Sequence, residues 1–195
     1  MKKSLKMIAM AAVLVMAMAA GMAGSSLAYF TSEDAGGDTY PVGTIHTDII
    51  EENGDYTVKQ PYVTNNGEVE CLVRMRYTIS PSQVVRVSGT DAAAWAPAST
   101  ESGAGVWYYY SGVLQPGETT GEPLFTTVAL NDGFTDADLA NVKINLDQEA
   151  VQASVTLAKD VTVTVGGVKT TLAKGTVVTD AAAIWALYDQ GALGD

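Results

Sequence analysis

Between Val69 and Ile79, apolar and polar side chains alternate with the period of two that a strand buried on one face requires. One face of this segment carries Val69, Cys71, Val73, Met75, Tyr77 and Ile79. The other face carries Glu70, Arg74, Arg76 and Thr78, with Leu72 as an apolar exception. The pattern predicts a half-buried antiparallel strand. Residues 65–67 (Asn-Asn-Gly) predict a turn before it, and residues 56–63 are predicted as the strand that enters this turn.

Three later segments also predict strands. Residues 106–114 and 124–130 are rich in aromatic and β-branched side chains, and they are predicted to pair through the irregular loop that contains Pro116-Gly117. In residues 161–172, alternating valines lead into Gly166-Gly167. This pattern predicts a tight hairpin, because both glycines tolerate the positive φ of two-residue turns.

The apolar phase changes within residues 142–157. Apolar side chains occupy even positions at first (Val142, Ile144, Leu146) and odd positions afterwards (Val151, Ala153, Val155, Leu157). A regular strand keeps one phase on one face, so the sequence predicts a bulge or break between Asp147 and Glu149.

Helical signals are short. Residues 135–141 are predicted to form one helical turn with Thr135 as its cap. Near the end, Asp180 precedes a run in which Ile184, Leu187 and Tyr188 recur at helical spacing, and Gly191 follows as a terminator. Many short strands with one short amphipathic helix predict an all-β fold, a jelly-roll-like antiparallel β-sandwich with a short C-terminal helix.

The N-terminal residues have the pattern of a secretory signal peptide. Lys2, Lys3 and Lys6 precede an apolar run over residues 7–22, and Ser26 and Ala28 supply the small residues that signal peptidases recognise. We expect residues 1–28 to be removed between Ala28 and Tyr29, which leaves residues 29–195 as a single domain. The alternative is a retained membrane anchor, but the apolar run is shorter than the roughly 20 residues of a membrane span.

Charge and cysteine usage narrow the class of protein. Beyond residue 28 the chain has eight basic and 22 acidic residues, a net charge of −14. This balance argues against nucleic acid and against an anionic membrane as a partner, since both favour clustered Lys and Arg. Cys71 is the single cysteine, so no disulfide can form within the chain, and its place on an apolar strand face predicts a buried, inert thiol.

The chain is poor in catalytic groups. His46 is the single histidine, so H-E-x-x-H zinc binding is not available, and no G-x-S-x-G motif is present. The acidic loop of residues 131–138 lacks the spacing of a calcium-binding loop and is interpreted as solvated, with calcium as the alternative. Residues 107–110 (Trp-Tyr-Tyr-Tyr) are predicted to place one aromatic pair in the core and one outside. We therefore predict no enzyme activity, no cofactor and no metal.

Four blocks resemble the TasA and camelysin (CalY) family of exported Gram-positive proteins. The first block contains Ala28, Tyr29, Phe30, Thr31, Asp34 and Gly43. The second is similar to the family's P-x-V-x-N-x-G block and V-R-x-R strand, through Pro61, Val63, Asn65, Gly67, Val73, Arg74 and Arg76. The third, residues 107–128, looks like its aromatic strand, L-x-P-G-E-x-T loop and L-F strand, and the fourth, residues 149–153, like its late A-V-Q-A strand. The hairpin at Gly166-Gly167 departs from the family pattern.

The resemblance implies a secreted structural protein of the cell surface or biofilm matrix that assembles into fibres. Its signal would be cleaved by a SipW-type signal peptidase, and its partners would be copies of itself and other matrix proteins, with no membrane contact after cleavage. Residues 29–42, with Tyr29, Phe30 and Tyr40, are the expected flexible assembly segment, which adds as a strand to the next subunit. The alternatives are a camelysin-like surface metallopeptidase and a carbohydrate-binding adhesin that uses residues 107–110.

Arg74 and Arg76 stand out on the polar face of the clearest strand in a chain with only three arginines. We expect them to pair with carboxylates on neighbouring strands, worth about 0 to 1 kcal/mol each if they are exposed. The functional alternative is a contact with a neighbouring subunit.

Overall fold

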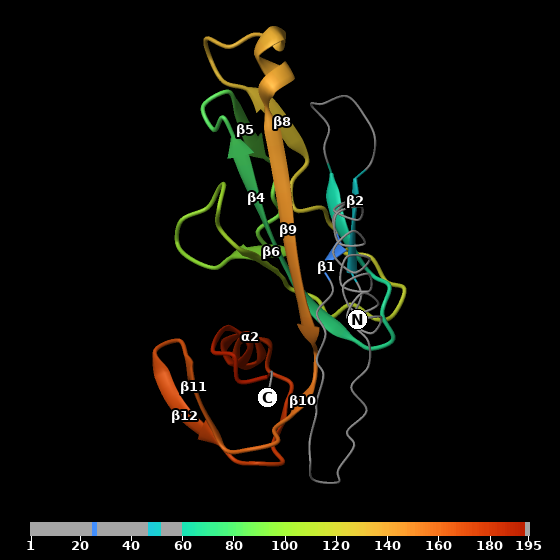
Figure 1. Ribbon diagram of the computed structural model, residues 1–195, viewed down its shortest axis with the longest axis vertical. Coiled ribbons are helices and arrows are strands. Elements are labelled where there is room, and N and C mark those ends of the chain that lie inside the picture. The colour runs from blue at the N-terminus through green and yellow to red at the C-terminus, as the bar shows by residue number, and fades with distance from the viewer. Residues whose placement is uncertain (1–24, 27–46, 52–59, 194–195) are drawn as a thin grey trace, which may run out of the picture.

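The computed structural model describes residues 25–26, 47–51 and 60–193 of the chain (Figure 1). The strands are β1 (Ser25–Ser26), β2 (Thr47–Glu51), β3 (Pro61–Asn65), β4 (Cys71–Ser80), β5 (Val85–Ser88), β6 (Trp95–Pro97), β7 (Tyr108–Tyr110), β8 (Thr127–Leu130), β9 (Lys143–Gln152), β10 (Val155–Thr156), β11 (Val161–Val165), β12 (Val168–Leu172) and β13 (Val177–Val178). A 3-10 helix, η1 (Asp136–Asn141), precedes β9, and helix α2 (Ala181–Asp189) follows β13.

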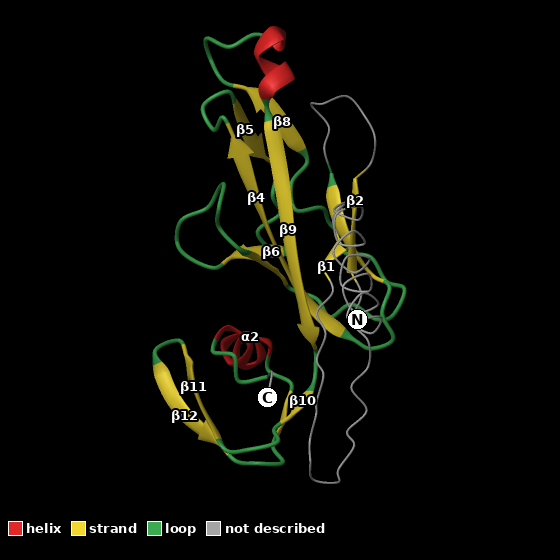
Figure 2. Ribbon diagram, in the orientation of Figure 1, coloured by secondary structure: helices red, strands yellow, loops and turns green. Residues whose placement is uncertain are grey.

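All strand pairs are antiparallel in the part of the chain that the structure describes. The largest sheet has the order β6-β7-β4-β9, and a three-stranded sheet has the order β1-β2-β3. Three two-stranded sheets are formed by β5 with β8, β10 with β13 and β11 with β12. Figure 2 shows that strands predominate over the single short C-terminal helix. The predicted all-β sandwich with a short C-terminal helix is confirmed.

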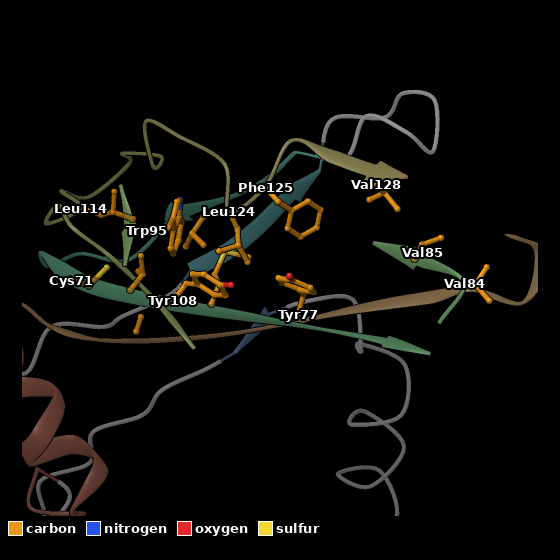
Figure 3. Packing of buried hydrophobic residues seen from close by; sticks show 14 residues of the cluster. Cys71, Tyr77, Val84, Val85, Trp95, Tyr108, Leu114, Leu124, Phe125 and Val128 are labelled. Carbon is orange, nitrogen blue, oxygen red and sulfur yellow. The ribbon is translucent and has the colours of Figure 1, made fainter. Parts of the chain in front are cut away.

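The first hydrophobic core fills the space between two layers of strands (Figure 3). The large sheet contributes the inner face of β4 with Trp95, Tyr108 and Ala150, and the opposite layer contributes β3, β5, β8 and the segment at Leu124 and Phe125. The Tyr77 and Phe125 rings meet edge to face, with their centroids 5.3 Å apart. Burial of the predicted face of β4, from Cys71 to Tyr77, is therefore confirmed.

A second core lies on the outer face of β4 and β9. Its buried members are Leu72, Val151, Ala153, Leu157, Val163, Val178, Ile184, Trp185 and Leu187. Residues 153–193 form β10 to α2 and cover this face near the end of β9 (Figure 1). The prediction that β4 turns its second face to solvent is wrong for its first half, because Leu72 and Arg74 are only 5% and 6% exposed.

Strand β9 contains no bulge, so that prediction is wrong. It pairs with β4 residue by residue, from Cys71 opposite Gln152 to Ser80 opposite Lys143. Its apolar phase changes because the two cores use opposite faces of one regular strand. Ile144, Leu146 and Ala150 pack in the first core, whereas Val151 packs in the second.

The predicted pairing of residues 106–114 with 124–130 is also wrong. Strand β7 pairs with β4 and β6, whereas β8 pairs with β5. The intervening loop follows β3 instead of turning back, as the Thr120 N–H donates to Val63 O and the Leu124 N–H donates to Pro61 O. The loop thereby carries the chain from one layer of the sandwich to the other.

The remaining local predictions are largely confirmed. Gly166 and Gly167 close the hairpin between β11 and β12 with φ values of 56° and 82°. The Asp180 carboxylate accepts a hydrogen bond from the Ala183 N–H and caps α2. The Thr135 N–H and hydroxyl both donate to the Asp138 carboxylate at the start of η1. Of the strand predicted over residues 56–63, the structure describes residues 60–63, where β3 begins at Pro61 and continues to Asn65. Residues 52–59 lie outside the described range.

Candidate functional site

Arg74 occupies the middle of β4 and turns its side chain toward the C-terminal helix. The side chain is 7% exposed. Its Nη1 and Nη2 donate to both carboxylate oxygens of Asp189 at 3.1 and 2.7 Å, and its Nε donates to Glu149 Oε2 at 2.7 Å. Nη1 also donates to the Tyr109 hydroxyl at 3.1 Å. One guanidinium thus joins β4, β7, β9 and the last residue of α2.

Four aromatic rings surround the same guanidinium. Its Cζ lies 4.7 Å from the Trp107 ring centroid, 5.6 Å from Tyr109, 4.6 Å from Trp185 and 5.5 Å from Tyr188. These distances are within the range of cation–π attraction. Arginine suits this position because its planar, weakly hydrated head can stack on rings while it binds carboxylates in its plane. We call these six partners and Arg74 the Arg74 cluster.

The electrostatics of the cluster keep Arg74 charged. Burial lowers the pKa of the guanidinium, but hydrogen bonds to Asp189, Glu149 and Tyr109 outweigh burial and raise the pKa above its ordinary value. Burial also raises the pKa of the Tyr188 hydroxyl. The geometry of the cluster is that of a joint between α2 and the large sheet.

Arg76 has different surroundings, although it lies only two residues away on the same face. Its Nε donates to Asp147 Oδ2 at 2.9 Å, and the two side chains are 41% and 48% exposed. The prediction that both arginines pair with carboxylates on a neighbouring strand is confirmed, since Glu149 and Asp147 lie opposite them on β9. Arg74 has little surface left for a neighbouring subunit, whereas Arg76 keeps part of its surface exposed.

Residues 107–110 alternate as predicted. Tyr108 and Tyr110 pack in or against the first core, and Trp107 and Tyr109 lie on the opposite face of the sheet. The outer pair is not a free sugar-stacking platform. The guanidinium of Arg76 lies 4.6 Å from the Trp107 ring centroid, in addition to Arg74 at 4.7 Å, and the Tyr109 ring contacts Trp185 edge to face.

Each of the five sheets in the described residues has two edge strands, and two of these edges are candidate sites for an added strand. The first edge belongs to β9, which is ten residues long and is the last strand of the large sheet. The Ala153 N–H donates to Glu70 O, so the backbone groups of Ala153 point toward β4. Hydrogen-bonded pairs alternate along an antiparallel ladder, so the even-numbered residues before it point the other way. Ile144, Leu146 and Ala150 therefore direct their backbone N–H and C=O groups away from β4.

The second edge belongs to β12 in the two-stranded hairpin. Val165 and Val168 flank the two-residue turn and form its closing pair, so the backbone groups of Lys169 and Thr171 point away from β11. All residues from Val168 to Thr171 are exposed. Strand edges of this kind are templates for pairing with another chain.

Several predicted residues lie outside the part of the chain that is described. These are the cleavage residues Ala28 and Tyr29, the assembly residues Phe30 and Tyr40, and His46. From residue 60 to residue 193, and in the two short N-terminal strands, no group of three or more His, Cys, Asp or Glu residues is placed to hold a metal ion. No helix in these same ranges is both long and apolar enough to span a bilayer.

Comparisons of the chain with protein-family models, curated proteins and solved structures found no match. The resemblance to the TasA and camelysin family therefore stays a prediction. Sequence reasoning found Arg74 but missed its main partner, Asp189, which lies 115 positions away on a helix whose docking face was not predicted. The signal that points to it is the odd apolar phase after residue 150, because that phase requires a cover on the outer face.

Proposed function

We propose that the chain is an exported structural protein of the cell surface or extracellular matrix, which assembles into fibres by strand addition. Residues 1–28 are removed between Ala28 and Tyr29, which also removes β1 and leaves β2 as an edge strand of its sheet. Residues 29–42 of one copy pair with an open sheet edge of the next. The partners are further copies of the chain, other matrix proteins and, during export, a SipW-type signal peptidase. No catalytic step is part of this function.

The observation that carries the proposal is that the sheets of the described residues have open strand edges, among them those of β9 and β12. Natural proteins usually protect such edges, because an unpaired row of N–H and C=O groups promotes association. A contact between a sheet edge of one copy and a different segment of the next copy is heterologous. Heterologous contacts that do not close into a ring generate filaments. The two edges and the composition of residues 29–42 therefore support head-to-tail assembly.

The energetics favour a segment that becomes ordered only on assembly. The stretch from Tyr29 to Tyr40 holds three acidic residues and two glycines, which disfavours stable local structure. Ordering a strand costs backbone entropy for every residue that is fixed. Burial of Tyr29 and Phe30 and the new backbone hydrogen bonds act against this cost once an edge is available.

Deletion of residues 29–38 tests the proposal. The full mature chain, residues 29–195, is expected to form fibres that sediment. The shortened chain, residues 39–195, is expected to stay a folded monomer with an unchanged melting temperature, because the core residues that the structure describes lie between Val63 and Leu193. Sedimentation and electron microscopy measure assembly, and circular dichroism checks folding. Fibres from the shortened chain, or a shortened chain that does not fold, would show that these residues are not the assembly segment.

A further inference from the structure

We propose that the edge which accepts residues 29–42 is β12 of the C-terminal hairpin and not the longer edge of β9. This inference rests on the proposed function and names its acceptor site. The segment that binds at this site is the N-terminal segment of a second copy of this chain. Three properties of the hairpin carry it: its open backbone groups, its exposed apolar side chains and its charge.

The backbone and side chains of β12 fit an added strand. Lys169 and Thr171 offer outward N–H and C=O groups, because Val165 and Val168 form the closing pair of the hairpin. Val168 is 65% exposed at the start of this strand. It lies on the same face as Val163, which is buried against α2 in the second core. An added strand with aromatic side chains can extend this apolar face and bury Val168.

Charge distinguishes β12 from β9 as the acceptor. Residues 29–42 contain Glu33, Asp34 and Asp38 and no Lys or Arg, a net charge of −3. Residues 159–174 of the hairpin contain three lysines and one aspartate, a net charge of +2. Residues 60–153, which form the sandwich around β9, contain four basic and eleven acidic residues, a net charge of −7. An acidic segment is therefore attracted to the hairpin and repelled by the sandwich.

The local environment of the two edges agrees with the net charges. Lys169 lies within β12 and Lys174 follows it by two residues, and both are exposed. The β9 edge begins directly after η1, where Asp136 and Asp138 lie. Arg74 and Arg76 beside it are already bound to carboxylates, and Lys143 is exposed at its first residue. The larger excess of positive charge therefore lies at β12.

The test compares two charge reversals in the mature chain, Lys169→Glu in β12 and Lys143→Glu at the start of β9. Both lysines are exposed and both changes alter the net charge equally. We expect Lys169→Glu to raise the protein concentration needed for fibre formation at least about tenfold, because it replaces attraction with like-charge repulsion. We expect Lys143→Glu to change it less than about twofold. Melting temperatures check that both variants are folded.

Two further variants make the result specific. Asp34→Lys in the Lys169→Glu background is expected to restore assembly, since it exchanges the signs of the two partners. Thr171→Pro removes an outward N–H without removing a backbone hydrogen bond between β11 and β12, and it is expected to abolish assembly. It also removes the hydrogen bond between the Thr162 and Thr171 hydroxyls, so Thr171→Val, which removes only this bond, is its control. Equal effects of Lys169→Glu and Lys143→Glu, with assembly still lost in the chain 39–195, would overturn the choice of β12 while the proposed function stands. Fibres from the chain 39–195 would overturn both.

Discussion

Arg74 and Arg76 share one face of one strand, yet the Arg74 side chain is 7% exposed and the Arg76 side chain is 41% exposed. Removing Arg74 leaves Glu149 and Asp189 without their cation and opens a space between four rings. Loss of one partner of a buried pair costs roughly 3 to 5 kcal/mol, and the partial exposure of both carboxylates reduces this cost. We expect Arg74→Ala to lower the free energy of unfolding by about 2 to 4 kcal/mol.

Arg76→Ala is the matched control for this prediction. Its ion pair with Asp147 is exposed, so the expected loss is within about 1 kcal/mol. Urea denaturation of both variants measures the two losses under the same conditions. Equal stability of the variants would contradict the role of the Arg74 cluster as a joint, and loss of fibre formation without loss of stability in Arg74→Ala would favour an intersubunit contact instead.

Cys71 provides a prediction on pH dependence. Its side chain is fully buried in the first core, and burial raises the pKa of the thiol to about 12. The unfolded chain has an ordinary thiol pKa of about 8.5. The unfolded state therefore loses this proton first, and the free energy of unfolding should fall as pH rises from about 8.5 toward 12.

The Cys71→Ala variant separates this titration from that of the tyrosines. Tyr77 also has a pKa raised to about 12 by burial and by Tyr108, so alkaline destabilisation should persist in the variant with a smaller slope. In the native protein, the thiol should not react with a maleimide at pH 8 and should react after unfolding in urea. Rapid reaction of the native protein would show that the first core does not exclude reagents at this position.

At the scale of elements, the second core gives the outer face of β4 a structural role. Leu72 packs there with Val151 of β9 and with side chains of α2. We expect Leu72→Ala to cost about 2 to 5 kcal/mol, the range for a leucine removed from a core. Thr78→Ala on the same face of the same strand lies beyond the second core and should cost less than about 1 kcal/mol. Similar losses would show that residues 153–193 do not cover this face.

Short-range sequence patterns predict some of the elements, but they do not predict how the elements pack against one another. The β4 alternation, the hairpin at Gly166-Gly167 and the capped α2 follow from short-range chemistry, so their positions were predictable. The bulge in β9 was predicted on the assumption that all apolar side chains of this strand pack into one core on one face. Two cores on opposite faces of the same strand produce the same pattern without an extra residue. Only the tertiary position of residues 153–193 distinguishes the two explanations.

At the scale of the whole molecule, the Arg74 cluster holds the C-terminal hairpin and α2 against an acidic sandwich. This arrangement places a hairpin of net charge +2, residues 159–174, beside an acidic body, and both have open strand edges. Neither edge was predictable from the alternation pattern, because edge position depends on the order of strands in the sheets. The proposed acceptor for residues 29–42 therefore depends on the folded chain, whereas the composition of the segment itself is visible in the sequence.

Amide hydrogen exchange tests the central claim, assembly by strand addition, most directly. In the monomer, the amides of Lys169 and Thr171 should exchange quickly, because their N–H groups point away from β11. In fibres of the mature chain they should become protected, while the amides of Val168 and Thr170 already have partners and should change less. Fibres in which the outward amides of β12 and of β9 all exchange as fast as in the monomer would contradict the account.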